Sequence, residues 1–480
     1  MLTTFDIAAD LDTPVSAYLK LGPLTPRFLL ESAEGGERLG RYSFIGFGEA
    51  LEVRLQGGLL RVGGDTVAAP STSANLLQAL RAALGRAPRP GPDPGGAPFT
   101  GGLVGVAGWG LAPLLAGAPA RGRATARAAG AEDGRAAAGV SAAAGDEPLA
   151  AYVAPRSLLV FDHLTRSAAL LHDGPENERL SLRREVRAIL GGPRPPARPA
   201  GRIEPARPSV DRARFVDGVV RAQREIAAGE VYQLVLSVRY SGACDIAPFQ
   251  AYRALRLLNP SPYLYFCDFG DLAVAGSSPE ALVRLSGREA SLRPIAGTRP
   301  RGATTAEDIE RERDLLADPK EAAEHVMLVD LARNDLGRVA VTGSVNVDPF
   351  RSIERYSHVM HLVSGVRGVL RPGVDAFDLF AAAFPAGTVS GAPKIRALEL
   401  IDAIEPVGRG LYAGTVGYFG TAGTMDQAIA IRTLAFRDGG YSYQAGAGIV
   451  ADSIPEREHD EVRAKAAVLE AALRMAGEGL

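Results

Sequence analysis

Alternation of apolar and polar residues predicts antiparallel strands in the first half of the chain. Short apolar runs separated by turn residues predict strands between residues 27 and 62. SLLVFDH and AALLHD predict two more strands around a turn at Thr165 and Arg166, and FTGGLVGVAGWG is typical of a glycine-rich buried strand. Helical spacing of apolar residues predicts helices over 74–85 and 176–190.

The second half repeats this mixture of strands and helices. A helix is expected over 211–228 and a strand over 231–240, and further strands are predicted over 263–268, 272–276 and 281–286. Two long helices are expected near residues 319 and 455. Neither a GxGxxG turn that opens a helix after a strand nor a GxxxxGK[ST] loop occurs, which argues against common nucleotide-binding folds. We therefore expect an α+β protein with large antiparallel sheets.

Composition changes along the chain suggest where domains meet. GGPRPPARPAGRIEPARPS is rich in proline and predicts a tether. We expect an N-terminal region over 1–190, a linker over 191–209 and a second domain over 210–475. Residues 111–147 are dominated by Ala, Gly and Arg with little periodicity, and they predict irregular structure.

Overall charge narrows the classes of partner. The 480 residues are 46% hydrophobic and 22% charged, so a substantial core is expected. Lys and Arg number 53 against 55 Asp and Glu, and this balance gives no field that would collect nucleic acid or an anionic membrane. The two cysteines form no CxxC pair, the N-terminus is acidic, and no apolar run is long enough to span a membrane. We expect a cytoplasmic protein that acts on small molecules.

Two acidic pairs at helical spacing are candidates for a metal site. In DPKEAAEHVMLVDLARND, Asp318 is the expected N-cap, and Glu321 and Glu324 extend the stripe of Leu328 and Leu331. In DSIPEREHDEVRAKAAV, Ser453 and Glu456 predict a capping box, and a single stripe carries Glu458, Glu461, Lys465 and Val468.

Four inward-facing carboxylates would repel one another unless a cation lay among them. Carboxylate oxygens favour a hard divalent ion, with Mg²⁺ as the first choice. Two solvated helix faces are an equally good interpretation at this point.

Other polar groups have both structural and functional interpretations. Gly446 and Gly448 precede the second helix, where backbone amides can meet an anion or simply form a tight turn. Arg432 lies among apolar residues and needs a carboxylate, either in a structural salt bridge or on a substrate. His361 lies in an apolar run, where a satisfied core histidine is the usual case.

Taken together and in order, the motifs resemble the chorismate-utilising enzymes, and within that family anthranilate synthase component I. The similarity is strongest over residues 210–470 and looser over 20–170. It is carried by LLESAE, VYQLVLSVR, NPSPYLYF, GSSPEALVR, RPIAGTRPRG, DPKEAAEHVMLVDLARNDLGRV, YSHVMHLVS, FPAGTVSGAPKIRALELI, GLYAGTVGYF, MDQAIAIRT and QAGAGIVADSIPEREHDEVRAKA.

The resemblance implies a fold, a reaction and a set of residue roles. The implied fold is a sandwich of large antiparallel sheets with helices outside. Ammonia would add at C2 of chorismate, the C4 hydroxyl would leave, and loss of pyruvate would give anthranilate. Glu324 and Glu461 would ligate Mg²⁺, with Glu321 and Glu458 beside them. Glu280 would be the general acid. His361 would lie beside the ring and assist proton transfer. The remaining groups would contact the substrate, and they are Thr298, Thr388, Tyr412, Arg432, Gly446, Gly448 and Lys465.

The resemblance also implies what supplies and regulates the reaction. Neither cysteine suits a glutaminase nucleophile, so ammonia is expected from a separate glutamine amidotransferase subunit. A tryptophan feedback site is expected from Leu30, Glu31, Ser32, Asn259, Pro262 and Tyr263.

Two positions separate this chain from other members of the family. Gln233 stands where relatives that add water carry a lysine, and Ala296 stands where aminodeoxychorismate synthases carry one. Aminodeoxychorismate synthase component I is the alternative enzyme, and a catalytically inactive regulatory subunit is the alternative of another class.

Overall fold

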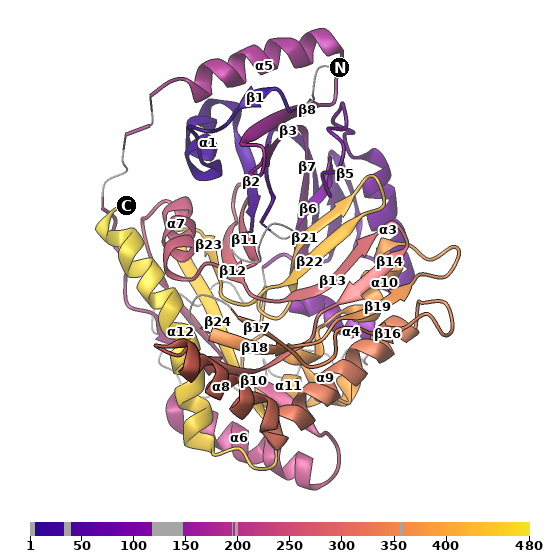
Figure 1. Ribbon diagram of the computed structural model, residues 1–480, viewed down its shortest axis with the longest axis vertical. Coiled ribbons are helices and arrows are strands. Elements are labelled where there is room, and N and C mark those ends of the chain that lie inside the picture. The colour runs from indigo at the N-terminus through magenta and orange to yellow at the C-terminus, as the bar shows by residue number, and fades with distance from the viewer. Residues whose placement is uncertain (1–4, 33–39, 118–146, 194, 197–199, 356–358) are drawn as a thin grey trace.

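The computed structural model is built on a large curled antiparallel sheet with helices around it (Figure 1). It describes residues 5–32, 40–117, 147–193, 195–196, 200–355 and 359–480. One sheet contains 21 strands and a second contains three, and every pairing between their strands in this part of the chain is antiparallel. The expected α+β class with large antiparallel sheets is confirmed.

The first half of the chain forms eight strands and the helices between them. These elements are β1 (Ile7–Ala8), α1 (Pro14–Lys20), η1 (Gly22–Leu24), β2 (Pro26–Glu31), β3 (Tyr42–Gln56), β4 (Leu59–Val62), β5 (Asp65–Ala68), α3 (Ser73–Arg86), β6 (Gly102–Ala107), η2 (Trp109–Leu111), α4 (Ala112–Ala116), β7 (Ala150–Asp162), β8 (Ser167–His172) and α5 (Glu176–Leu190). The helices expected over 74–85 and 176–190 are confirmed as α3 and α5.

The second half contains most of the functional motifs. Its elements up to the first acidic helix are β9 (Arg207–Pro208), α6 (Arg212–Ala227), β10 (Gln233–Ala243), α7 (Pro248–Leu258), β11 (Tyr263–Asp268), β12 (Ala273–Ser278), β13 (Ala281–Ser286), β14 (Glu289–Leu292), β15 (Ile295–Pro300), α8 (Thr305–Ala317) and α9 (Pro319–Gly337). The rest are β16 (Asn346–Val347), β17 (Ser352–Arg355), β18 (Val359–Val363), β19 (Val366–Val369), α10 (Ala376–Ala383), η3 (Gly387–Val389), β20 (Gly391–Ala392), α11 (Lys394–Ile404), β21 (Thr415–Gly420), β22 (Met425–Ile429), β23 (Thr433–Arg437), β24 (Gly440–Ile449) and α12 (Pro455–Glu478).

Strands from the two halves share the large sheet. β6 pairs with β21, and β2 pairs with β11. The glycines of β6 permit close strand contact, since a Cβ on Gly105 would lie 2.0 Å from the Ala151 carbonyl oxygen. The proposed boundary at 191–209 therefore separates two stretches of sequence whose strands lie side by side, and four residues of that linker (194 and 197–199) fall outside the described residues.

An aromatic cluster packs across the same junction. The ring of Phe99 lies 4.5 Å from that of Tyr418 on β21 and 5.6 Å from that of Phe44 on β3. Phe99 is only 1% exposed, so truncation to alanine would cost about 3–5 kcal/mol of stability. The core therefore joins the N-terminal strands to the sheet that bears the site.

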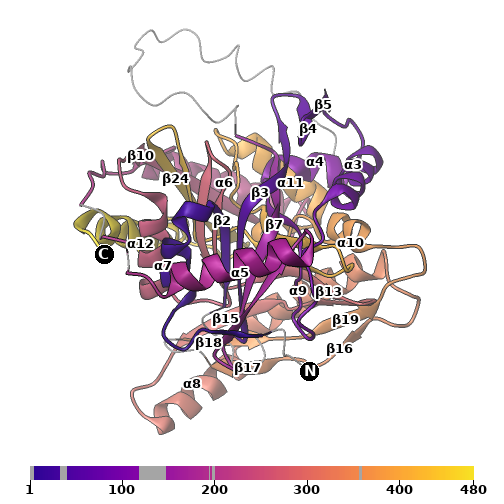
Figure 2. The ribbon, with the colours of Figure 1, turned by 90° about the horizontal axis from the view of Figure 1, so that it is seen from above.

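Helices cover both sides of the strands. α7 and α12 lie on one side, and α3 and α10 lie on the other, in both views (Figure 1, Figure 2). α4 ends at Ala116, and residues 118–146 of the Ala/Gly/Arg-rich segment lie outside the described residues.

Candidate active site

The first acidic helix begins as the sequence predicts. The Asp318 side chain accepts hydrogen bonds from the backbone amides of Lys320 at 2.9 Å and Glu321 at 3.2 Å, and Pro319 is the first helical residue. Glu324 is half-buried, and its pKa is raised by burial and by the charges of Glu321 and Glu461. The carboxylates of α9 and α12 therefore lie within electrostatic range of each other.

The second acidic helix starts differently from the prediction. Its N-cap is Ile454, with no side-chain cap, so the predicted Ser453–Glu456 capping box is wrong. The Ser453 hydroxyl instead accepts from the Val450 amide at 3.1 Å, because the chain turns one residue before the helix begins. The Glu458 pKa is raised by burial, with Glu461 adding to the rise.

The core-facing stripe of α12 is also displaced from the predicted one. Val462, Ala466 and Leu469 are buried, whereas the side chains of Glu461 and Lys465 are about half exposed at 49% and 50%. Glu461 therefore lies beside the core stripe and not on it. Lys465 Nζ donates to Glu461 at 2.7 Å and to the Gly446 carbonyl oxygen at 3.1 Å, which links α12 to β24.

The four glutamates suit a hard cation in chemistry, but they do not form a finished cage. Within the described ranges, no three His, Cys, Asp or Glu side chains are grouped closely enough to hold a metal. Burial raises the pKa of Glu324 and Glu458, and the charges of neighbouring glutamates add to the rise; a divalent ion with oxygen ligands would relieve that repulsion. The oxygen donors of the four glutamates therefore suit Mg²⁺ in their chemistry.

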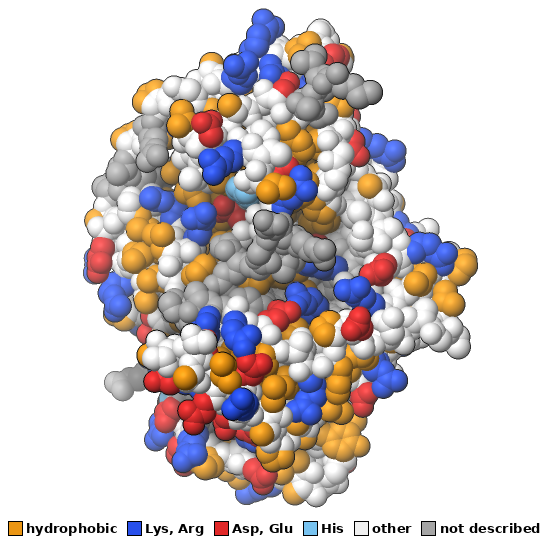
Figure 3. Space-filling view, viewed as in Figure 1, with side chains coloured by type: hydrophobic (Ala, Val, Ile, Leu, Met, Phe, Trp, Pro, Cys, Tyr) orange, Lys and Arg blue, Asp and Glu red, His pale blue; other side chains and the backbone are white. Residues whose placement is uncertain are grey.

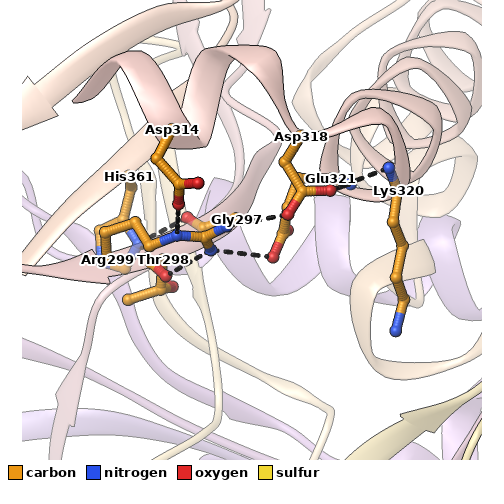
Figure 4. A network of polar contacts seen from close by, with 8 residues as sticks. All are labelled: Gly297, Thr298, Arg299, Asp314, Asp318, Lys320, Glu321 and His361. Atoms are coloured by element: carbon orange, nitrogen blue, oxygen red, sulfur yellow. Dashed lines mark hydrogen bonds and ion pairs between the residues drawn. The ribbon is translucent and has the colours of Figure 1, made fainter. Parts of the chain in front are cut away.

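Arg299 ties the start of α9 to the strand that faces His361 (Figure 4). Its guanidinium donates to Asp314 at 2.7 Å, to Asp318 at 2.8 Å and to Glu321 at 3.3 Å. Gly297 has φ +64°, and a Cβ there would lie 3.1 Å from Glu321 Oε2. Glu321 is thus held beside the RPIAGT loop.

Thr298 and His361 meet across the β15–β18 pairing. The Thr298 hydroxyl lies 3.0 Å from His361 Nδ1, and the Gly297 carbonyl oxygen lies 3.2 Å from the same nitrogen (Figure 4). These contacts orient the imidazole of a half-buried His361. The histidine therefore lies at the edge of the site and not in the apolar core.

Glu280 occupies the turn between β12 and β13. Its carbonyl accepts from the Ile429 amide at 3.0 Å, which fixes the backbone there. Burial raises the pKa of its carboxyl to about 7, and the nearby Thr388 hydroxyl, which makes no hydrogen bond of ordinary geometry to a described residue, opposes part of that rise. Glu280 and Thr388 line one small cavity, which Asp335 and Leu331 also line. A carboxyl that is half protonated near neutral pH suits general acid chemistry.

The two glycines of the QAGAG motif lie inside β24 and do not form a turn. Gly446 pairs with Ser237 and Gly448 with Val235 on β10. A Cβ on Gly446 would lie 2.6 Å from the Tyr412 hydroxyl oxygen. Burial raises the Tyr412 pKa to about 12, so the phenol remains a neutral hydrogen-bond donor.

The start of β10 completes this face of the site. Gln233 is 4% exposed, and its Nε2 would lie 3.0 Å from a Cβ on Gly448. The structure therefore brings together Gln233, Tyr412, Gly446 and Gly448, with Lys465 reaching them from α12.

Arg432 is joined to a residue predicted for tryptophan. Arg432 Nη1 donates to Asn259 Oδ1 at 3.2 Å, and the Asn259 side chain donates to the Ser277 hydroxyl at 2.9 Å. Arg432 has φ +50°, an unusual conformation for a non-glycine residue. Asn259 therefore links Arg432 to β12, the strand that leads to Glu280.

The other predicted tryptophan-site residues surround a separate cavity of about 340 Å³. Aromatic side chains make up much of its wall, and its lining includes Leu30, Glu31, Ser32, Tyr42, Phe44, Pro262, Tyr263, Arg284, Tyr418 and Asp426. Asn259 does not line it. Glu31 accepts hydrogen bonds from Tyr252 and from Arg256 Nε, the latter at 3.2 Å, so its carboxylate already has partners.

Two buried ion pairs near the site were not predicted from the sequence. Arg409 and Glu405 lie 2.7 Å apart, with side chains 1% and 7% exposed, and Lys394 lies 2.9 Å from Asp335. The signal for Arg409 was available, because it is an isolated charge in the glycine-rich apolar run VGRGLYAGTVGYF.

The visible surface agrees with the balanced charge of the chain. Basic and acidic side chains are interspersed over the face shown in Figure 3. Among the described helices, none combines the length and apolar character that crossing a membrane would require.

Comparisons with known proteins match this architecture. A family model described as chorismate binding enzyme matches residues 26–471. Proteins named anthranilate synthase component 1 are 42% identical in Thermus thermophilus, covering 98% of this chain and 97% of the relative, and 42% identical in Pseudomonas aeruginosa, covering 95% and 92%.

Solved structures give the same picture. Anthranilate synthase component I from Streptococcus pneumoniae has a TM-score of 0.74 at 33% identity, covering 90% of this chain and 92% of that one. A menaquinone-specific isochorismate synthase from Escherichia coli shares the fold, with a TM-score of 0.67 at 20% identity and coverage of 96% and 91%. The chain belongs to the family of chorismate-binding enzymes.

Proposed function

We propose that this protein is the large subunit of an anthranilate synthase, a Mg²⁺-dependent lyase that converts chorismate and ammonia to anthranilate, pyruvate and water. The observation that carries the proposal is the half-buried Glu280 carboxyl in the cavity that Thr388 also lines, where desolvation raises its pKa to about 7. Departure of the C4 hydroxyl needs an acid that still holds its proton near neutral pH. The similarity to proteins named anthranilate synthase component 1 supports the choice of reaction.

Each predicted residue has a role in this reaction. Ammonia attacks C2, and Glu280 donates its proton to the departing C4 oxygen, which leaves as water. His361, oriented by Thr298, assists proton transfer as C2 loses its proton and the enolpyruvyl group leaves as pyruvate. Thr388 lines the cavity of the general acid and would contact the substrate there. The enolpyruvyl carboxylate is bound by Arg432, Tyr412, Lys465 and the amides of Gly446 and Gly448.

Magnesium has a defined place in the proposal. Glu324 and Glu461 would hold the ion, with Glu321 and Glu458 next to them. When bound, Mg²⁺ supplies positive charge for the ring carboxylate of chorismate. The raised pKa values of Glu324 and Glu458 support a cation at this place, because burial raises both and the repulsion from neighbouring glutamates, which adds to the rise, would be offset by a metal.

The residues at two positions favour ammonia attack at C2. The Gln233 amide has no basic nitrogen, so it cannot deprotonate a water molecule, and the buried Ala296 has no amine that could act as a nucleophile. These two side chains argue against water addition and against aminodeoxychorismate synthase, the second candidate.

Supply and regulation complete the proposal. A separate glutamine amidotransferase subunit would deliver ammonia in the cytoplasm. Tryptophan would inhibit by binding the cavity of about 340 Å³ lined by Ser32, Pro262 and Tyr263, whose aromatic walls and charged Arg284 and Asp426 suit an aromatic amino acid.

Product identity tests the proposal. Purified protein is incubated with chorismate, Mg²⁺ and ammonium, and anthranilate is followed by its fluorescence. Anthranilate that forms only when all three are present is the expected result. A non-fluorescent product that a lyase converts to 4-aminobenzoate would replace the proposal with aminodeoxychorismate synthase.

A further inference from the structure

A buried arginine lies behind the substrate face of the site. Arg409 follows α11 and is 2% exposed. Its Nε donates to Glu405 Oε2 at 2.9 Å and its Nη2 donates to Glu405 Oε1 at 2.7 Å. This bidentate pair uses part of the planar guanidinium and leaves donors for other groups.

The remaining donors hold two backbone carbonyls close to substrate-binding groups. Arg409 Nη1 donates to the Val389 oxygen at 2.7 Å, and Nη2 donates to the Val235 oxygen at 2.7 Å. Val389 directly follows Thr388 in η3, and Val235 pairs with Gly448 across β10 and β24. One side chain therefore fixes both the Thr388 loop and the strand next to Gly448.

Aromatic rings enclose the same guanidinium. Its central carbon lies 4.3 Å from the Trp109 ring centroid and 5.6 Å from that of Tyr412. The Trp109 amide donates to the Gly410 carbonyl oxygen at 2.8 Å, and the Tyr412 amide donates to that of Arg409 at 3.0 Å. Trp109 belongs to the first half of the chain, so the arginine also joins the two halves behind the site.

The partner carboxylate extends the network toward Gly446. Glu405 Oε1 accepts from the Ser237 amide at 2.9 Å and from its hydroxyl at 2.7 Å. Ser237 pairs with Gly446, whose Cα lies under the Tyr412 hydroxyl. The ion pair thus supports both glycines of the QAGAG motif from behind.

We infer that Arg409 is a positioning residue for the aminating reaction. It holds Thr388, Tyr412 and the strand that bears Gly446 and Gly448 in the arrangement that chorismate meets. A lysine at position 409 would keep the charge, but it would lose the planar fork that contacts the carboxylate, two carbonyls and two rings together. This inference rests on the proposed function, because it assigns Arg409 to that reaction.

A double-mutant cycle separates positioning from general stabilisation. Arg409→Lys is expected to lower kcat about 10- to 100-fold and to alter the pH dependence of kcat, because the loop that carries Thr388 would no longer be fixed at the cavity that Glu280 also lines. If Arg409 acts through Thr388, the double variant Arg409→Lys/Thr388→Ala loses little more than the worse single variant. Fold-losses of kcat that multiply in the double variant would overturn the inference. An Arg409→Lys enzyme with unchanged kcat and pH profile would also overturn it.

The matched control uses an ion pair in the N-terminal strands. Arg41 donates to Asp162 through Nε at 3.1 Å and through Nη2 at 2.8 Å, and its guanidinium lies 4.9 Å from the ring centroid of Tyr42, which lines the separate cavity and not the cavity of Glu280. Arg41→Lys also weakens a bidentate pair, and its effect on kcat should be small. In the double variant with Thr388→Ala, the fold-losses of kcat from the two substitutions should multiply.

Trp109 provides a readout that needs no turnover. It is the only tryptophan in the sequence, so intrinsic fluorescence excited near 295 nm reports on the ring that covers Arg409. Titrating wild-type protein with chorismate and Mg²⁺, without ammonium, should shift Trp109 emission with saturation, and Trp109→Phe should remove the signal. Unchanged emission at saturating chorismate would overturn the inference even if Arg409→Lys fails to fold. Absence of anthranilate with a normal emission shift would instead count against the proposed reaction alone.

Discussion

Gly446 lies directly under the Tyr412 hydroxyl, since a Cβ at position 446 would lie 2.6 Å from that oxygen and 2.8 Å from the Leu236 carbonyl oxygen. The contact explains why the predicted substrate face carries glycine inside a strand, where glycine otherwise weakens the ladder. Tyr412 can approach the backbone only if position 446 has no side chain.

Gly446→Ala is therefore expected to displace Tyr412 and to lower kcat/KM for chorismate by about tenfold or more, with a loss of roughly 1–3 kcal/mol in stability. Steady-state kinetics and thermal unfolding measure both effects. Gly85→Ala is the control, because a Cβ on Gly85 in α3 meets nothing within 4 Å. Equal kinetics for the two variants would contradict the close contact.

The Glu280 pKa of about 7 predicts the pH dependence of the reaction. A general acid must be protonated, so kcat should fall about tenfold for each pH unit above 7. Glu280→Gln should lower kcat by about 10²- to 10⁴-fold and should abolish this decline. A wild-type profile that stays flat from pH 6 to 9 would argue against Glu280 as the acid.

The raised pKa of Glu280 also makes the folded protein less stable as pH rises. It is raised from an ordinary 4.5 to about 7, so the contribution of Glu280 to folding is fully present below pH 4.5 and is lost as pH rises through about 7. At pH 8 the buried carboxylate should destabilise the protein by roughly 1–3 kcal/mol relative to a neutral group. Glu280→Gln should thus unfold at a higher temperature than wild type at pH 8, and the two should converge near pH 4.5.

Gln233 should determine which nucleophile attacks C2. Gln233→Lys is expected to introduce a base next to Gly448 and to admit water, with isochorismate or salicylate detectable by chromatography. Gln233→Met has a similar length and no base, and it should form neither product. Identical product mixtures from the two variants would remove Gln233 from this role.

Ser32 should contribute to inhibition by tryptophan, because it lines the separate cavity with Pro262 and Tyr263. Loss of one hydrogen bond in Ser32→Ala should raise the half-inhibiting tryptophan concentration by roughly 2- to 12-fold and leave kcat unchanged. Ser344→Ala, in a surface turn and not among the residues that line the cavity, is the control. Superimposable inhibition curves would count against this assignment.

Much of the fold could be predicted from local patterns. Alternating strands and the helix that begins at Pro319 follow from residue spacing and from the Asp318 cap, both of which are local signals. The sharing of one sheet by both halves could not be predicted in this way, because the β6–β21 pairing joins residues more than 300 positions apart.

The candidate site was also predictable from local patterns only in part. The spacing of Glu321 and Glu324 correctly indicated that both lie on one face of a helix. The Ser-x-x-Glu pattern, in contrast, predicted the wrong N-cap for α12. The Ser453 hydroxyl accepts from the Val450 amide in a turn and is not used as a helix cap. The Asn259–Arg432 contact and the Arg409 network depend on long-range packing of loops. No periodic pattern encodes such contacts.

Magnesium binding tests the central claim, which is that α9 and α12 hold one ion between them. Calorimetric titration of wild-type protein with Mg²⁺ in the presence of chorismate, without ammonium, should show a single site. Glu324→Gln and Glu461→Gln should each weaken it by more than about 100-fold, since even outer partners of metal ligands contribute 10- to 100-fold. Glu456→Gln, exposed in the first turn of α12, should bind like wild type. Wild-type affinity in both Glu324→Gln and Glu461→Gln would contradict the account.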